Sequence, residues 1–232
     1  MGVQSTDSGT GKRRTENRFL IENDMITIID TASERTTPDH YLRPMRSALI
    51  ATLTAALVAC ASPAFNGVVL DPPDKAPALR LSDSLGVPFD VAEQRGKVVM
   101  LFFGYTHCPD VCPTTLVDWR HVADSLGTKA GDVRFVFVSL DPERDTPALT
   151  QRYAARFSPA FVGLTGSRAG IDSLKSAWKF AAFRDGVPTD TSTYTVTHPS
   201  QVFVIDPKGR LRLMQRPGLT TAQVAADIRA LL

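Results

Sequence analysis

The chain has no strong excess of charge and no hydrophobic run long enough to span a membrane. Its 26 Lys and Arg residues against 24 Asp and Glu residues give a formal net charge of +2, and nothing in this balance indicates a nucleic-acid partner. The apolar stretch between Arg46 and Cys60 is shorter than the roughly 20 residues that a transmembrane helix needs. The sequence also has no internal repeat. The 232 residues therefore fit one globular domain preceded by a leader.

Cysteine is scarce, with 3 residues in the chain. Cys60 ends the sequence Leu57-Val58-Ala59-Cys60, which follows Arg43, Arg46 and a short apolar segment, as in a secretory signal peptide. This sequence resembles a bacterial lipobox, in which the cysteine becomes the lipidated first residue of the mature protein. We therefore expect lipidation of Cys60, which excludes it as a disulfide partner or metal ligand. An uncleaved membrane anchor or a buried cysteine is the alternative.

These features divide the chain into four predicted parts. Residues 1–44 are polar, so we expect a disordered tail or an over-extended gene prediction, with Met45 as the better start. Residues 45–59 form the predicted signal peptide, and the prolines and small residues of 60–77 predict a flexible tether. Residues 78–232 form the predicted folded domain. The lipid anchor would place the protein in a bacterial cell envelope, facing the periplasm or extracytoplasmic side.

The remaining two cysteines, Cys108 and Cys112, follow the apolar run 98–103, which predicts a strand buried on both faces. The apolar residues of 114–126 have helical spacing. Both thiols are therefore predicted at a helix N-terminus, where free backbone N–H groups favour the thiolate, and their spacing places both sulfurs on one side of the first turn. Such a pair can close a reversible disulfide or bind one metal ion. A structural disulfide or two inert thiols is the alternative, although so short a disulfide loop would stabilise the fold little.

The rest of the domain alternates between predicted strands and helices. The predicted elements are a hairpin over 79–91, strand 133–140, a helix over 147–157 capped by Thr146, strand 161–164, a helix over 167–181 capped by Ser167, an irregular polar stretch 184–197, strands 201–205 and 211–214 around the turn 206–209, and a helix over 221–231. This order predicts an α/β fold with a central mixed sheet, helices on both faces and an extra N-terminal β-hairpin.

A dithiol at a strand-to-helix turn in this order of elements resembles the thioredoxin fold. The fuller string 103–113, Phe-Gly-Tyr-Thr-His-Cys-Pro-Asp-Val-Cys-Pro, resembles the Sco/SenC family of copper-binding assembly factors for cytochrome c oxidase. Residues 138–147 are similar to a loop of this family and 204–209 to its hairpin, and His198 lies where its histidine ligand is expected. Thioredoxins have two residues between the cysteines, not three. The resemblance covers about 79–232.

This resemblance implies copper binding by Cys108, Cys112 and His198, and a reversible Cys108–Cys112 disulfide. Two thiolates and one imidazole suit Cu(I), and the same set holds Cu(II) with added nitrogen or oxygen ligands. The implied function is that of a copper chaperone for the binuclear copper site of cytochrome c oxidase subunit II. An upstream copper donor or a thiol reductant is the other implied partner of this chaperone. Pro199 departs from the family, which usually has serine or threonine there; proline stiffens the loop, and a cis bond after His198 is one option.

Five other polar residues have simpler interpretations. His107 is expected at the surface or in a hydrogen bond, with a role in the outer shell of the metal as the alternative. His121 is expected to be packed or solvated, and His40 lies outside the mature protein. Asp110 is expected to cap the helix and Asp141 to form a turn.

The rival function is that of a thiol-disulfide oxidoreductase, in which one cysteine attacks a partner disulfide and the other resolves the mixed disulfide. A peroxidase is disfavoured because no sequence feature identifies a peroxide pocket. His198 discriminates between the two main functions, since an oxidoreductase has no evident need of it. The sequence favours a copper-binding assembly factor over an enzyme.

Overall fold

The computed structural model describes residues 64–186 and 194–232. The predicted upstream segment, the signal peptide, Cys60 and His40 lie outside these residues, so their interpretation stays a prediction. Within the described ranges, none of the helices is both long and apolar enough to cross a membrane.

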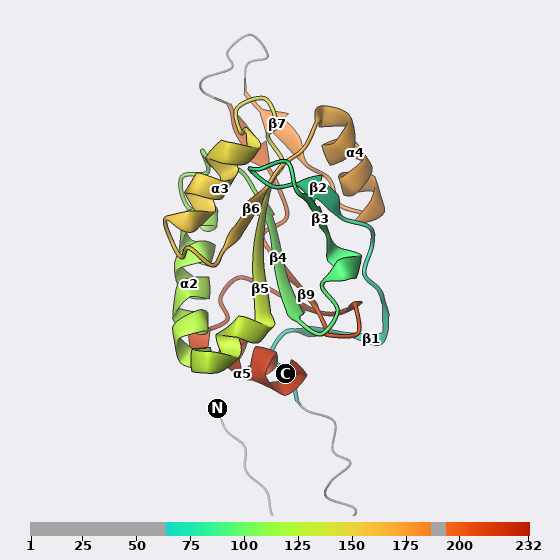
Figure 1. Cartoon of the computed structure of the whole chain (residues 1–232), viewed down its shortest axis with the longest axis vertical. Coiled ribbons are helices and arrows are strands. Elements are labelled where there is room, and N and C mark those ends of the chain that lie inside the picture. The colour runs from blue at the N-terminus through green and yellow to red at the C-terminus, as the bar shows by residue number, and fades with distance from the viewer. Residues whose placement is uncertain (1–63, 187–193) are drawn as a thin grey trace, which may run out of the picture. The chain divides into compact units, whose positions relative to one another are not determined.

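A mixed six-stranded sheet forms the centre of the domain (Figure 1), in the order β1-β10-β9-β4-β5-β6. Its strands are β1 (Val68–Lys75), β4 (Val98–Gly104), β5 (Val133–Ser139), β6 (Val162–Leu164), β9 (Val202–Ile205) and β10 (Arg210–Gln215). β4, β5 and β6 are parallel, whereas β9 and β10 run antiparallel to their neighbours. Every residue of β4 is buried, as its continuous apolar run predicts.

Helices cover both faces of this sheet. The helices are α2 (Val111–Leu126), α3 (Pro147–Ala155), α4 (Arg168–Ala177) and α5 (Thr221–Leu231). Alternate residues of β4 belong to two hydrophobic cores: Met100 and Phe102 pack with α2, α3 and α5, whereas Leu101 and Phe103 pack with α4 and a small hairpin. That hairpin consists of β2 (Arg80–Ser82) and β3 (Pro88–Asp90). The predicted α/β class, the helices on both faces and the N-terminal hairpin are confirmed.

The predicted starts of α3, α4 and α5 are confirmed by their caps. The Thr146 hydroxyl accepts a hydrogen bond from the Leu149 N–H at 3.2 Å, and the Ser167 hydroxyl accepts one from the Gly170 N–H at 3.1 Å. α5 begins with a capping box formed by Thr220 and Gln223. These local interactions fix the first turns of α3, α4 and α5.

The prediction of a flexible tether over 60–77 is wrong in its second half. β1 pairs with β10 there and forms an edge of the sheet, with a bulge between Val69 and Asp74 that contains two prolines. The backbone N–H of Gly67 donates a hydrogen bond to the buried Asp227 carboxylate at 2.9 Å. β10 offers a row of backbone N–H and C=O groups at this edge, and the segment pairs with them as an additional strand.

The irregular stretch predicted over 184–197 instead contains two paired strands, β7 (Phe183–Asp185) and β8 (Thr195–Thr197). α4 also ends earlier than predicted, because Lys179 takes a left-handed backbone with φ of 55°. In β8, Val196 is buried between two exposed threonines. This alternation was too short to predict a strand, yet β8 leads directly to His198.

Candidate metal centre

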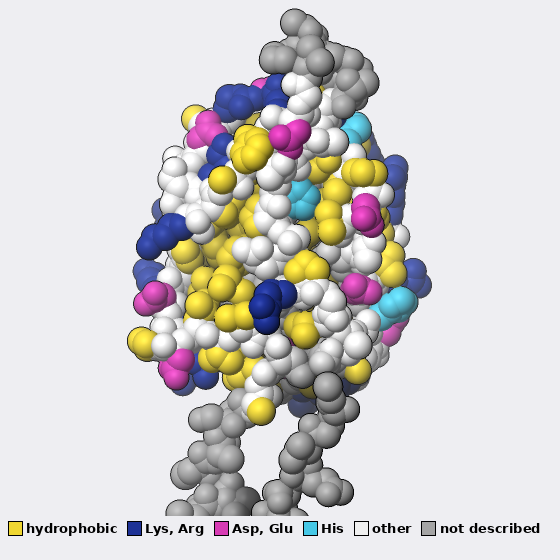
Figure 2. Space-filling view, turned by 180° about the vertical axis from the view of Figure 1, so that it is seen from behind, with side chains coloured by type: hydrophobic (Ala, Val, Ile, Leu, Met, Phe, Trp, Pro, Cys, Tyr) yellow, Lys and Arg dark blue, Asp and Glu magenta, His cyan; other side chains and the backbone are white. Residues whose placement is uncertain are grey.

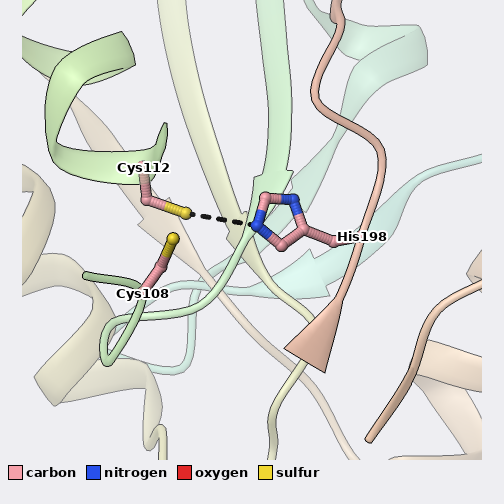
Figure 3. A group of neighbouring side chains, drawn as sticks. All are labelled: Cys108, Cys112 and His198. Atoms are coloured by element: carbon pink, nitrogen blue, oxygen red, sulfur yellow. Dashed lines mark hydrogen bonds between the residues drawn. The ribbon is translucent and has the colours of Figure 1, made fainter. Parts of the chain in front are cut away.

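Three side chains from separate elements meet at the carboxyl end of the central strand β4 (Figure 3). Cys108 lies in the turn after β4, Cys112 in the first turn of α2, and His198 between β8 and β9. Their ligand atoms all lie within 4.8 Å of one another, and the Cys112 Sγ is 3.7 Å from the His198 Nε2. Both cysteines are free thiols. The fold therefore brings together the three residues that the sequence predicts as ligands.

Gly104, the last residue of β4, makes room for the Cys112 sulfur. A Cβ atom at this position would lie 2.4 Å from the Cys112 Sγ and 2.9 Å from the Phe137 Cε2. α2 begins at Val111, earlier than the predicted start at 114, so Cys112 lies inside the helix and is fully buried. The absence of a side chain at Gly104 thus sets the depth of this sulfur.

The His198 ring is oriented by its surroundings. Its Nδ1 lies 3.0 Å from the Pro199 carbonyl oxygen, and because a carbonyl only accepts, the Nδ1 carries the hydrogen. The Nε2 then faces the sulfurs, as a metal ligand would. Phe102 and Tyr105 hold the ring edge-on, with centroid distances of 5.8 and 5.7 Å. The His198–Pro199 bond is not cis; among the described residues, only Asp71–Pro72 has that geometry.

The two thiols differ in acidity. The hydrogen bond from Cys112 lowers the pKa of Cys108 to about 3 despite the opposing effect of burial, and hydrogen bonds from His198 and backbone N–H groups act in the same direction. The same bond to Cys108, together with burial, raises the pKa of Cys112. Burial lowers the pKa of His198, but hydrogen bonds to Cys108 and Pro199 outweigh it, so the net shift is upward. The metal-free site therefore pairs one thiolate with one thiol at neutral pH.

Asp145 holds the loop that leads to Cys108. Its buried carboxylate accepts hydrogen bonds from the Thr106 backbone N–H at 2.8 Å, the Thr106 hydroxyl at 2.5 Å and the Ser139 hydroxyl at 2.5 Å. The His107 Nδ1 lies 3.5 Å from the same carboxylate. This role was not predicted from the sequence, although Asp145 lies in the loop 138–147 that is similar to a loop of the Sco/SenC family.

A second network ties the chain before His198 to the loop after β5. The Tyr194 hydroxyl donates a hydrogen bond to the Asp141 carboxylate at 2.5 Å, and the Arg144 Nε donates to the same carboxylate at 2.5 Å. The Arg144 guanidinium lies 3.5 Å from the centre of the Tyr194 ring. Burial, followed by the bond to Asp141, raises the pKa of Tyr194 to about 12. This contact could not be predicted from the sequence, since Tyr194 lies in the stretch predicted as irregular.

Among the described residues, the other predicted polar residues do not belong to this group of ligand atoms. Asp110 precedes α2, but its side chain makes no capping hydrogen bond, so the predicted cap is wrong. His107 is exposed beside Thr106, and His121 is exposed on α2. The Asp141 carbonyl accepts hydrogen bonds from the N–H groups of Arg144 and Asp145, which confirms the predicted turn.

Comparison with known proteins gives the family. The SCO1/SenC family model matches residues 70–232. The chain belongs to the SCO1/SenC family. It is 34% identical over 130 residues to the SCO2-like protein of Rickettsia felis, an alignment that covers 56% of this chain and 63% of that protein. It is also 34% identical over 140 residues to the human protein named SCO1 homolog, mitochondrial, covering 58% of this chain and 46% of that protein. The chain thus matches less than two thirds of the length of these relatives.

Solved structures confirm the predicted thioredoxin-like fold of this SCO1/SenC protein. The protein in the solution structure of apo Sco1 from Thermus thermophilus is 37% identical in sequence to this chain, and the two structures superpose with a TM-score of 0.67. The alignment covers 73% of this chain and 98% of the Thermus chain. Bradyrhizobium japonicum ScoI, whose structure has copper bound, is 35% identical in sequence to this chain and superposes with a TM-score of 0.61. The alignment covers 68% of this chain and 99% of the ScoI chain.

Proposed function

We propose that Cys108, Cys112 and His198 bind one copper ion. The observation that carries this proposal is the convergence of two sulfurs and one imidazole nitrogen within 4.8 Å. This donor set suits Cu(I), and added nitrogen or oxygen ligands allow Cu(II). The copper-bound ScoI structures from Bradyrhizobium japonicum and Arabidopsis thaliana, 35% and 29% identical to this chain, support the choice of metal.

The spacing of the ligand atoms fits a shared ion. Nitrogen and sulfur ligands lie roughly 2.0–2.3 Å from a bound metal, so two ligands on opposite sides of it lie about 4.0–4.6 Å apart. The observed limit of 4.8 Å exceeds this range only slightly. Small side-chain motions would therefore suffice to bind the ion, and the His198 Nε2 already faces the sulfurs.

The proposed role is delivery of copper, or of reducing equivalents linked to copper loading, to the binuclear copper site of cytochrome c oxidase subunit II. This role follows from the family resemblance and agrees with the exposure of the site. Cys112 is fully buried, whereas Cys108 retains 8% exposure and His198 is half-buried. An ion held here could pass to another protein by exchange of the two outer ligands. An upstream copper donor would load the site, and a thiol reductant would keep Cys108 and Cys112 reduced.

The proposed location is the bacterial cell envelope, with the domain attached to the membrane by lipid on Cys60. The basic and apolar leader that ends in Leu57-Val58-Ala59-Cys60 supports this proposal. Mass spectrometry of the mature N-terminus should find cleavage before Cys60 and a lipid-modified cysteine. An unmodified Cys60 or a retained 45–59 segment would contradict it.

The second candidate function is thiol-disulfide exchange, favoured by the lowered pKa of Cys108. In this reaction the Cys108 thiolate attacks a partner disulfide, forms a mixed disulfide and releases the partner's other sulfur as a thiolate. Cys112 then loses its proton and attacks the Cys108 sulfur. The products are a Cys108–Cys112 disulfide and a reduced partner, so two electrons pass to the partner.

His198→Ala separates the two functions, with His121→Ala as the matched control on the exposed side of α2. Copper titration and disulfide reductase activity are measured in parallel on the reduced proteins. We expect His198→Ala to weaken Cu(II) binding and impair oxidase assembly in cells, while Cys108 and Cys112 still oxidise and reduce. His121→Ala should match the parent. If His198→Ala binds copper like the parent and supports full oxidase activity, the copper assignment fails at its third ligand.

A further inference from the structure

His107 lies in a tight turn that ends at Cys108. The Cys108 backbone N–H donates a hydrogen bond to the Tyr105 carbonyl oxygen at 3.3 Å, and this bond closes the turn. The turn is also held from inside the protein, because the Asp145 carboxylate accepts a hydrogen bond from the Thr106 backbone N–H at 2.8 Å. The His107 side chain is 50% exposed, whereas that of Asp145 is fully buried. A fixed turn therefore presents an imidazole at the surface, one residue before a proposed copper ligand.

The contacts of this turn determine which nitrogen of the His107 ring carries the hydrogen. The Thr106 hydroxyl donates to the Asp145 carboxylate at 2.5 Å, so it has no further hydrogen to donate. The His107 Nδ1 lies 3.2 Å from this hydroxyl oxygen and 3.5 Å from the carboxylate. Both oxygens can only accept from the ring, so the Nδ1 carries the hydrogen and the Nε2 has a free lone pair. A histidine whose other ring nitrogen faces a carboxylate in this way is typical of metal ligands.

His107 and His198 thus have the same arrangement of the ring. The His198 Nδ1 lies 3.0 Å from the Pro199 carbonyl oxygen, and its Nε2 is the proposed ligand atom. His107 differs because it does not belong to the group of ligand atoms that lie within 4.8 Å of one another. On the face turned away from the viewer in Figure 1, histidine side chains reach the surface beside hydrophobic ones (Figure 2). His107 is therefore an imidazole oriented like a ligand, but outside the three-ligand site and more exposed than its members.

We propose that His107 is a transfer ligand, which binds the copper ion together with Cys108 while the ion enters or leaves the three-ligand site. This inference rests on the proposed function. Consecutive Cα atoms are about 3.8 Å apart, so the side chains of His107 and Cys108 can bind one ion. As the ion leaves, its bond to the His198 Nε2 breaks and a bond to the His107 Nε2 forms. No proton or electron moves in this step, because both nitrogens bind through a free lone pair.

The burial of the sulfur ligands explains the need for a ligand outside the site. Cys112 is fully buried and Cys108 is 8% exposed, so another protein has little access to an ion between the two sulfurs. Asp110 is also exposed and lies between the cysteines in sequence. Imidazole suits copper better than a carboxylate does, which favours His107 over Asp110. With His107 as a ligand, the ion moves toward solvent without first losing all its protein ligands.

The rate of Cu(I) transfer from the loaded protein to a chromophoric chelator, followed by stopped-flow absorbance, tests this role. We expect His107→Ala to transfer copper about tenfold more slowly than the parent, with an equilibrium affinity within about twofold of it, because His107 is not a ligand of the resting site. His107→Gln keeps a polar side chain without the imidazole and should behave like His107→Ala. His121→Ala is the matched control, since it removes the exposed histidine of α2, and it should transfer copper at the parent rate. Asp110→Asn should do the same.

The outcomes separate this inference from the proposed function. A parental transfer rate in both His107 variants, or slower transfer in Asp110→Asn alone, would overturn the role of His107 while the copper site stands. A loss of equilibrium affinity of about tenfold or more in His107→Ala would also overturn it, because His107 would then be a ligand of the resting site. A parent protein that binds no Cu(I) would contradict the proposed function and, with it, this inference.

Nitrogen-15 NMR of the metal-free protein provides a test that needs no copper. At about pH 8.5 histidine side chains are ordinarily neutral, and the spectrum then shows which ring nitrogen carries the hydrogen. We expect the hydrogen of His107 on the Nδ1, as for His198. A hydrogen on the Nε2 of His107 would occupy the position of the lone pair that binds copper and would overturn the proposal.

Discussion

Gly104→Ala should displace the Cys112 sulfur and thereby weaken copper binding. The new Cβ would lie 2.4 Å from the Cys112 Sγ and 2.9 Å from the Phe137 Cε2. Ordinary carbon contacts lie at roughly 3.5–4.0 Å, so the sulfur must move by about 1 Å or more. Phe137 is fully buried and cannot give way easily. The displacement therefore falls mainly on the sulfur and on the first turn of α2.

The expected magnitude has two parts. Forcing a methyl group into a packed core costs about 1–3 kcal/mol of unfolding free energy. A shift of this size in one ligand should lower copper affinity by about 10- to 100-fold, as loss of the groups that orient a ligand does. Urea unfolding of the metal-free protein measures the loss of unfolding free energy. Competition for Cu(I) with a chromophoric chelator measures the loss of copper affinity.

Gly163→Ala is the matched control, because its Cβ would lie 2.3 Å from the Thr150 carbonyl oxygen, in the contact between β6 and α3. It should lower stability while leaving copper affinity at the parent value. Gly131→Ala has no neighbour within 4 Å of the new Cβ and should change neither quantity. Parental copper affinity in a folded Gly104→Ala protein would refute the conclusion that Gly104 sets the position of Cys112.

Three further perturbations follow from the contacts around the site. Because the pKa of Cys108 is lowered to about 3, the ultraviolet absorbance of its thiolate should persist from about pH 8 to about pH 5. This absorbance should be absent in Cys108→Ser. Absorbance that titrates near pH 8.5 would contradict the lowered pKa. The thiolate stabilises the folded protein fully above the pKa that Cys108 has in the unfolded chain, and this stabilisation decreases as pH falls toward 3. The denaturation midpoint should therefore depend less on pH in Cys108→Ser than in the parent protein. Asp145→Asn replaces an acceptor of three hydrogen bonds and should cost about 1–3 kcal/mol in chemical unfolding; an unchanged midpoint would show that the Thr106 contacts do not stabilise the loop. Tyr194→Phe removes one hydrogen-bond donor to the Asp141 carboxylate and should lower both the stability of the protein and its affinity for Cu(II). If both stay at the parent value, the hydrogen bonds among Tyr194, Asp141 and Arg144 do not position His198.

The strand-to-helix turn could be predicted because each part has a strong local pattern. The apolar run before Gly104 has no polar interruption, and the caps at Thr146 and Ser167 are local interactions between residues three apart. β1 could not be predicted in this way, because its order depends on pairing with β10 far along the chain. Its two prolines also resemble those of a tether.

The members of the candidate site differ in how far they could be predicted. Cys108 and Cys112 were evident from their spacing, whereas His198 required the family resemblance, since it lies 86 residues from Cys112. Asp145 and Tyr194 were missed because their contacts cross 39 and 53 residues and leave no periodic pattern. Long-range hydrogen bonds of this kind follow from the topology of the sheet and not from local sequence.

X-ray absorption at the copper edge of the loaded protein tests the central claim most directly. Coordination by Cys108, Cys112 and His198 predicts two sulfur ligands and one imidazole nitrogen, at roughly 2.0–2.3 Å from the metal. His198→Ala should then lose the nitrogen contribution and retain both sulfurs. A spectrum without sulfur ligands, or one that His198→Ala leaves unchanged, would contradict the proposed copper site.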